Sequence, residues 1–283
     1  MNKTYLNLLS CLALLISTFS ISAAQELFPF KSVDTTELFM EVYYPDKMTA
    51  GEKYPALIFF YGGGWNSGSR AQFEPQAAYF AKRGIVCFLA DYRIKNIHKT
   101  GPHESLKDAK SAIRYLRAHA EDFQIDGNKL IAAGGSAGGH LAAATALIEG
   151  YNEITDDLSI SPVPNALVLF NPVIDNGPGG YGYERIRGEY KEFSPLHNVV
   201  AGAPPTLFLL GTKDSLIPVA TGHYYKMVME KVGSRCDLIL YEDQPHGFFN
   251  YSQFENYKKT VEATDIFLQS LGYLQEDSIL VIE

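Results

Sequence analysis

Residues 134–138 read Gly-Gly-Ser-Ala-Gly, so a single serine stands between small neighbours. The apolar segment 129–133, typical of a buried strand, precedes this motif, and an alanine-rich helical segment follows it as far as Ile148. A serine at such a strand-to-helix turn adopts a strained backbone, and the flanking glycines keep other atoms clear of it. Ser136 is therefore the candidate nucleophile, placed above a helix N-terminus that favours developing negative charge.

A phosphate-binding loop is the alternative for this glycine-rich turn. The turn has no lysine of the kind that a P-loop needs, and it lacks the third glycine of a dinucleotide-binding fingerprint. Both differences favour the nucleophile.

A second glycine-rich turn, Tyr61-Gly62-Gly63-Gly64-Trp65, follows the apolar segment 56–61. Successive glycines let backbone N–H groups turn toward a ligand oxygen, as an oxyanion hole requires. We expect the N–H groups of Gly63, Gly64 and Ala137 to be the donors, with Trp65 as a substitute for one of them. An ordinary turn is the alternative, but it does not explain three glycines at a strand end that precedes Ser136.

A serine nucleophile needs a base, and the base needs a carboxylate that orients it. His246 follows the apolar segment 238–241, and Asp214 follows the apolar segment 206–210. We predict that His246 is the base and Asp214 the acid. The rival acid, Asp243, stands too close to His246 in the chain to reach behind its ring.

The remaining histidines are weaker candidates for the base. His140 lies one helical turn beyond Ser136, which directs it toward the sheet and away from the site. The others are not paired with a carboxylate at a strand end: His98, His103, His119, His197 and His223. Asp91-Tyr92-Arg93 also ends a strand, and we interpret Arg93 as a local partner that holds loops together.

The elements that must position these residues alternate along the chain. Predicted strands cover 38–44, 56–61, 85–90, 129–133, 166–170, 206–210 and 238–241, and predicted helices cover 71–83, 105–119, 137–148, 218–232 and 253–271. Such alternation predicts a mostly parallel sheet of about eight strands with helices on both faces. Ligands of such sheets bind at the carboxyl ends of the strands, where every candidate residue falls. The glycine- and tyrosine-rich segment 171–198 is expected to loop over the site.

The composition is that of a globular protein. Of 283 residues, 46% are hydrophobic and 20% charged, and the net charge is −8, which disfavours nucleic acid and anionic membranes as partners. Residues 25–283 are expected to form one catalytic domain. Cys87 and Cys236 fall on separate strands and are expected to be free, and no Cys/His cluster has metal-ligand spacing, so neither metal nor cofactor is expected.

Residues 1–24 have the organisation of an export signal. Lys3 precedes an apolar stretch, 8–21, and Ser22-Ala23-Ala24 supplies small residues for cleavage before Gln25. The stretch is marginal for spanning a bilayer, so we favour a cleaved signal over a stable membrane anchor. A lipoprotein signal ending at Cys11 is disfavoured because the apolar run continues past it. The mature protein is expected in the periplasm or outside the cell.

These motifs together resemble those of the α/β-hydrolase esterases. The resemblance rests on the Gly-Gly-Gly-Trp turn, Asp91-Tyr92-Arg93, Gly-Gly-Ser136-Ala-Gly-Gly-His, Asp214 and Pro245-His246-Gly247-Phe248. It runs from about Leu38 to Leu271 and is strongest toward the bacterial feruloyl and acetyl-xylan esterase-like group, which neighbours the hormone-sensitive lipase family. It implies a serine carboxylesterase that works through an acyl-enzyme, with the triad in the chain order Ser, Asp, His.

Two departures from the family pattern bear on the substrate. Tyr61 stands where the family usually has a histidine that braces the oxyanion turn, and a tyrosine hydroxyl can also form hydrogen bonds. The Leu-Ala-Pro-Glu pattern of the lipases does not follow Asp91-Tyr92-Arg93, and the mature N-terminus is short for a helical cap. We therefore expect an open entrance to the active site. Such an entrance suits acetyl or feruloyl esters on plant or algal polysaccharides as well as small-molecule esters.

Aromatic residues near these motifs have two interpretations. Tyr61 and Trp65 are expected to contact the substrate. Together with Trp65, four other aromatic residues would form a surface that stacks on a sugar or an aromatic acyl group: Tyr181, Tyr183, Tyr190 and Phe193. Packing of a loop onto the core explains them equally well.

The sequence has two alternative functional interpretations. A serine exopeptidase uses the same triad, but the sequence shows no propeller domain and no acidic clamp for an amino terminus. A binding protein on an inactive hydrolase scaffold usually lacks a member of the triad, and here none is missing.

Overall fold

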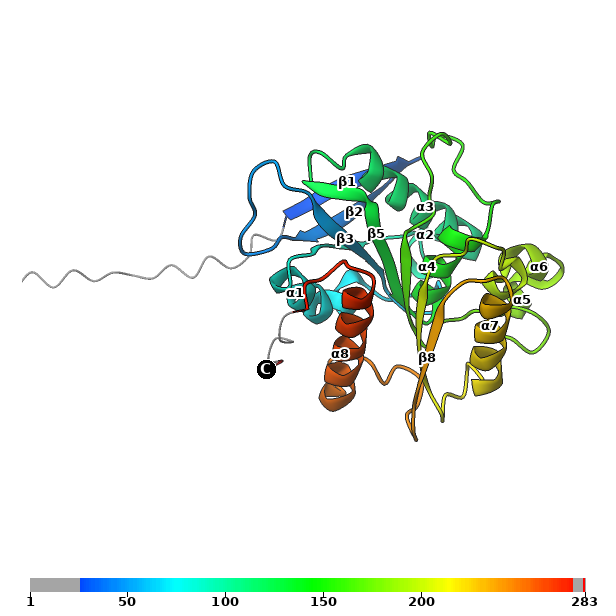
Figure 1. The fold of residues 1–283 in the computed structure, drawn as a ribbon. Coiled ribbons are helices and arrows are strands. Elements are labelled where there is room, and N and C mark those ends of the chain that lie inside the picture. The colour runs from blue at the N-terminus through cyan, green and yellow to red at the C-terminus, as the bar shows by residue number, and fades with distance from the viewer. Residues whose placement is uncertain (1–25, 277–281, 283) are drawn as a thin grey trace, which may run out of the picture.

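Eight strands form one sheet in the order β1-β2-β4-β3-β5-β6-β7-β8. The computed structural model describes residues 26–276 and 282 (Figure 1). The strands are β1 Glu26–Val33, β2 Thr36–Tyr43, β3 Tyr54–Phe60, β4 Val86–Ala90, β5 Ile125–Gly135, β6 Ala166–Phe170, β7 Thr206–Gly211 and β8 Cys236–Tyr241. From β4 to β8 neighbouring strands run parallel, whereas β2 pairs antiparallel with both β1 and β4. The predicted α/β-hydrolase sheet is confirmed.

Helices cover both faces of this sheet. They are α1 Glu74–Lys82, α2 Lys95–His98, α3 Pro102–Ala118, α4 Ala137–Leu147, α5 Tyr183–Ile186, α6 Tyr190–Phe193, α7 Val219–Lys231 and α8 Phe254–Ser270. In Figure 1, α1 and α8 lie on one side of the strands, with α3, α4 and α7 on the other. The Tyr79 hydroxyl of α1 donates to Asp265 of α8, 2.8 Å away, which joins the two helices of the first layer.

The strand β1 was not predicted. Its sequence contains Pro29 and Lys31, and the register of its pairing with β2 shifts between these two residues. An edge strand tolerates such a proline, and its apolar alternation is weak because little of it is buried. Pairing with β2 therefore decides its conformation.

The segment 171–198 contains more structure than the predicted loop. Besides α5 and α6 it has two 3₁₀ turns, Arg187–Glu189 and Pro195–Asn198. Leu196 donates its N–H to the Ile174 carbonyl at 3.0 Å, and Asn176 donates its N–H to the Ser194 hydroxyl at 2.7 Å. These bonds close the segment into a compact unit beside the carboxyl ends of the strands.

The structure describes Cys87 and Cys236 but not residues 1–25. Cys87 and Cys236 are free and buried, as predicted, and burial raises the pKa of the Cys87 thiol. Within the described ranges no helix combines the length and apolar character needed to cross a bilayer. The expected export signal, residues 1–24, lies outside the described residues.

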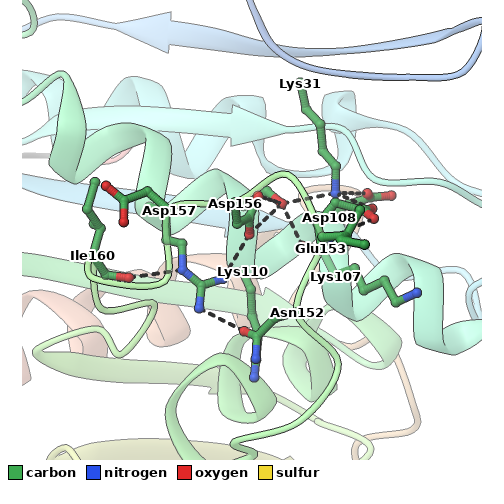
Figure 2. A network of polar contacts seen from close by, with 12 residues as sticks. Lys31, Lys107, Asp108, Lys110, Asn152, Glu153, Asp156, Asp157 and Ile160 are labelled. Atoms are coloured by element: carbon green, nitrogen blue, oxygen red, sulfur yellow. Dashed lines mark hydrogen bonds and ion pairs between the residues drawn. The ribbon is translucent and has the colours of Figure 1, made fainter.

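A buried ionic network joins β1 to α3 and to the loop that follows β4 (Figure 2). Asp108 is fully buried and accepts hydrogen bonds from Lys31 Nζ at 2.6 Å and from Arg93 Nε and Nη2 at 2.8 Å each. Glu153 completes the pairing, 3.0 Å from Lys31 and 2.9 Å from Arg93. Arg93 is thus a local structural partner, as the sequence indicated.

Asp108→Ala should destabilise the protein strongly. Removing one partner leaves Lys31 and Arg93 buried with less compensation, which costs about 3–5 kcal/mol of unfolding free energy. Urea unfolding measures the loss. Glu121→Ala is the matched control, because its partner Lys53 forms an exposed ion pair, and it should leave the unfolding curve nearly unchanged. Equal effects of the two substitutions would contradict this account of the network.

Candidate active site

Ser136 stands at the turn between β5 and α4 with φ 53° and ψ −117°, a strained conformation for a residue with a side chain. The turn closes only because its neighbours are small. A Cβ atom on Gly138 would lie 2.0 Å from the Phe60 carbonyl oxygen, and one on Gly134 would lie 2.3 Å from the Gly138 oxygen. The Ser136 N–H donates to the Phe170 carbonyl at 3.0 Å. The serine is therefore held at the carboxyl edge of the sheet.

His246 contacts both Ser136 and Asp214. Its Nε2 lies 2.9 Å from the Ser136 hydroxyl oxygen, and its Nδ1 lies 2.7 Å from Asp214 Oδ2. The Asp214 side chain is fully buried, and its other oxygen accepts the N–H groups of Leu216 at 2.8 Å and Ile217 at 2.9 Å. With Nδ1–H donating to Asp214, Nε2 presents a lone pair to the serine hydroxyl.

The rival acid, Asp243, lies elsewhere. Its carboxylate is exposed and pairs with Lys213 at 2.7 Å, and its N–H donates to the Thr212 hydroxyl at 2.8 Å. The structure brings Asp214, and not Asp243, to His246.

The glycine-rich turn passes beside the nucleophile. A Cβ atom on Gly62 would lie 3.4 Å from Ser136 Cβ. Gly63 and Gly64 have φ values of 135° and 64°, and a Cβ on Gly63 would lie 2.0 Å from the Ser67 carbonyl oxygen, so this position requires glycine.

Three backbone donors remain available next to Ser136. In the part of the chain that the structure describes, no hydrogen bond occupies the N–H of Gly63, Gly64 or Ala137. Ala137 is the first residue of α4, where an N–H has no partner within the helix. Such donors can receive the negative charge of a tetrahedral intermediate.

Trp65 and Tyr61 are buried, at 1% and 4% exposure. The Trp65 ring packs edge-on against His140, with 5.2 Å between ring centroids, and against Phe193 at 6.3 Å. Tyr61 stacks on Tyr92 at 4.3 Å. The structure therefore places both rings in packing contacts beneath the glycine turn, instead of on a surface open to substrate.

His140 belongs to this packing. It is fully buried, and its Nε2 lies 2.9 Å from the Phe193 carbonyl oxygen. Burial lowers the pKa of His140 to about 4, so the ring is neutral and Nε2 donates to that oxygen. Its ring packs against Trp65 and Phe193, so His140 has a packing role, and His246 is the histidine that contacts Ser136.

Several residues that hold the site were not singled out in the sequence. The Tyr92 hydroxyl donates to the Tyr61 carbonyl at 2.6 Å, whereas the Tyr61 hydroxyl donates to the Tyr92 carbonyl only at 3.4 Å. The root of the glycine turn is therefore held by Tyr92. In the sequence, Tyr92 is marked only by its place between Asp91 and Arg93 at the end of a predicted strand.

A chain of side-chain amides joins the glycine turn to the loop of His246. Gln72 accepts the Gly62 N–H at 2.6 Å and donates to Asn250 at 2.9 Å, and Asn250 donates to the Gly247 carbonyl at 2.8 Å. No local pattern in the sequence marks these amides. They fix the donors of the turn relative to the base.

Asn171 and Arg185 support the site from the segment after β6. Asn171 Oδ1 accepts the Gly247 N–H at 2.9 Å, and its Nδ2 lies 3.4 Å from His246 Nε2. Arg185 donates to the Gly64 carbonyl, and its guanidinium lies 5.7 Å from the centroid of the Trp65 ring. Among residues 26–276 and 282, no group of three or more His, Cys, Asp or Glu side chains could hold a metal ion.

Comparison with known proteins points to one class of hydrolase. The BD-FAE family profile matches residues 40–178. The chain is 27% identical over 242 residues to an acetylxylan esterase of Xylanibacter ruminicola, covering 80% of this chain and 48% of that protein. It spans about half the length of the curated relatives that it matches.

The similarity to solved structures covers nearly the whole of both chains. The structure of Thermogutta terrifontis esterase 2 phosphorylated by paraoxon is 41% identical, with a TM-score of 0.85 over 89% of this chain and 96% of that one. The propionate-bound form of the same esterase is 40% identical, with a TM-score of 0.85 over 90% and 97%.

Tyr92→Phe should slow the acylation of Ser136 by p-nitrophenyl acetate. Without the hydroxyl the Tyr61 carbonyl loses its donor and the glycine turn loosens, so kcat should fall roughly tenfold, less than the ~10²–10³ of a lost oxyanion donor. Tyr61→Phe is the control and should be nearly silent, since 3.4 Å is a weak bond. A larger loss in Tyr61→Phe than in Tyr92→Phe would reverse the assignment.

Proposed function

Because the chain belongs to the α/β-hydrolase serine esterases, near the feruloyl and acetylxylan esterases, we propose that it hydrolyses carboxylic esters through an acyl-enzyme on Ser136. One observation carries the proposal: Ser136, His246 and Asp214 form a continuous hydrogen-bonded chain with separations of 2.9 and 2.7 Å. This geometry supports the proposed roles of Ser136 as nucleophile, His246 as base and Asp214 as orienting acid.

In the proposed reaction, His246 Nε2 takes the hydroxyl proton of Ser136 as the oxygen attacks the ester carbonyl. Asp214 holds the Nδ1–H tautomer and stabilises the imidazolium that forms. The same nitrogen then protonates the departing alcohol. Water repeats the sequence on the acyl-enzyme, and the carboxylic acid leaves. No step requires a cofactor.

The N–H groups of Gly63, Gly64 and Ala137 are the proposed oxyanion donors. Their open hydrogen-bonding positions beside Ser136 support this role, and Tyr92, Gln72 and Arg185 hold the turn that presents two of them. Donors fixed before the reaction need no reorganisation when the charge develops, which is the source of their catalytic effect.

The proposed substrates are acetyl or feruloyl esters on plant or algal polysaccharides or their oligosaccharide fragments. Similarity to an acetylxylan esterase supports this class.

We also propose that residues 1–24 are a cleaved export signal and that the mature enzyme acts in the periplasm or outside the cell. Lys3, the apolar stretch 8–21 and Ser22-Ala23-Ala24 support it. Sequencing the N-terminus of the full-length protein expressed in a Gram-negative host should give Gln25 in the periplasmic or secreted fraction. An intact Met1 in the cytosol would contradict the proposal.

Ser136→Ala should fold normally and lose roughly 10⁴-fold or more in turnover of p-nitrophenyl acetate. Asp214→Asn should also lose several orders of magnitude, since the amide stabilises the wrong tautomer of His246. Asp243→Asn, which changes the other acid in the neighbouring loops, is the matched control and should be mild.

An active-site label gives an independent readout of the same assignment. The similar T. terrifontis esterase is phosphorylated by paraoxon, so paraoxon should inactivate this enzyme with one adduct, mapped to Ser136 by peptide mass spectrometry. Near-native turnover in Ser136→Ala, or an adduct on another residue, would refute the proposed nucleophile.

A further inference from the structure

A hollow of about 220 Å³ lies between the segment after β6 and the loop that follows Asp214. Its walls include Ile174, Asp175 and Tyr181 from the segment after β6, and Leu216, Ile217 and Thr221 from the loop after β7 and the start of α7. Ile217 donates its N–H to Asp214, and Val173, next to Ile174, donates its N–H to the Ser136 carbonyl at 3.0 Å. One wall of the hollow is thus built on the loop of Asp214, and the other on a segment that hydrogen-bonds to the backbone of Ser136.

Tyr181 connects this hollow to the oxyanion turn. Its hydroxyl lies 2.5 Å from the place that a Cβ on Gly64 would occupy, so the tyrosine is in contact with the turn. The walls therefore contact both the loop of Asp214 and the oxyanion turn.

A second hollow, of about 520 Å³, continues outward from the first. The two share Asp175 and Thr221, and the second is lined further by His197, Tyr224 and Val228. Figure 1 shows the segment with α5 and α6 beside α7, and the two hollows lie between these elements. Tyr224 is 52% exposed, so its ring is accessible from this groove.

One wall of the first hollow belongs to the loop that carries Asp214, the partner of His246. His246 protonates the departing alcohol oxygen, so the alcohol part of an ester stands on the histidine's side of Ser136. Leu216 and Ile217 belong to the loop of Asp214, which lies behind His246. An acetyl group needs no such length of groove, whereas a large alcohol does.

The lining has the chemistry that binds sugars. One oxygen of Asp175 accepts the Gly177 N–H at 2.8 Å, and a carboxylate has further acceptor positions for hydroxyl groups. Thr221 adds a hydroxyl, while Tyr181 and Tyr224 supply flat apolar faces. A polyol with apolar C–H faces satisfies both kinds of group.

We propose that these two hollows form an oligosaccharide-binding groove, in which the first holds the esterified sugar and the second holds the next sugar of the chain. This inference rests on the proposed esterase function and assigns Asp175 to the first sugar and Tyr224 to the second.

The test compares three esters of acetic acid: p-nitrophenyl acetate, an acetylated methyl β-xyloside and acetylated xylotriose. In the parent enzyme kcat/KM should rise from the xyloside to the xylotriose. Asp175→Asn keeps the acceptor for Gly177 but loses the charge, and should raise KM about tenfold for both sugar esters, with kcat little changed. Tyr224→Ala should remove only the increase in kcat/KM from the xyloside to the xylotriose.

A matched control separates a specific effect on the groove from a general effect of changing α7. Met227→Ala changes a residue on the same helix with the same 52% exposure that does not line either hollow, and should behave as the parent on every ester. All three variants should hydrolyse p-nitrophenyl acetate normally, because its nitrophenyl group has no sugar hydroxyls for Asp175 to bind and no second sugar to contact Tyr224.

Several results would overturn the groove. Sugar esters unaffected by Asp175→Asn and Tyr224→Ala, with p-nitrophenyl acetate still hydrolysed, would reject it and leave the esterase function standing. Loss confined to a cationic ester such as acetylcholine would assign Asp175 to an ammonium group instead. Failure to hydrolyse any ester would refute the proposed function itself.

Discussion

The strained turn at Ser136 is the constraint on which the rest of the site depends. A positive φ at a residue with a side chain costs about 1–3 kcal/mol and persists only where the surroundings impose it. Here β3 and β5 lie side by side, and the Phe60 carbonyl at the end of β3 fits against the bare Cα of Gly138. The packing of strands and helix thus compensates for the strain, and the serine hydroxyl is presented at the open edge of the sheet.

Parallel pairing brings the partners of Ser136 to that same edge. The loops after β3, β7 and β8 carry the glycine turn, Asp214 and His246, and neighbouring parallel strands end at the same side of a sheet. Their relative positions are then set by side chains instead of by the strands. Gln72 and Asn250 join the glycine turn to the histidine loop, so oxyanion donors and base are held as one unit.

The segment after β6 contacts both the turn of the proposed oxyanion hole and the proposed groove. Phe193 and Tyr181 lie against the Trp65 ring, and Arg185 holds the Gly64 carbonyl, so the segment supports the turn of the proposed oxyanion hole. Its other side forms one wall of the groove toward α7. Different side chains of one segment thus support the turn of the proposed oxyanion hole and line the proposed groove.

The sequence alone determined the features that depend on neighbouring residues. The buried strands 166–170 and 206–210, the turn at Ser136 and the loops of Asp214 and His246 follow from local apolar runs and local glycines, so their patterns could be read directly. The edge strand β1 could not, because Pro29 and Lys31 weaken its alternation and only pairing with β2 makes it a strand. Tertiary structure also decided that Trp65 is buried and that Tyr92, 31 residues along the chain, holds the Tyr61 carbonyl. The Gln72–Asn250 bond spans 178 residues. A polar side chain has many partners within its chemical reach, and only the folded chain selects which distant residue meets it.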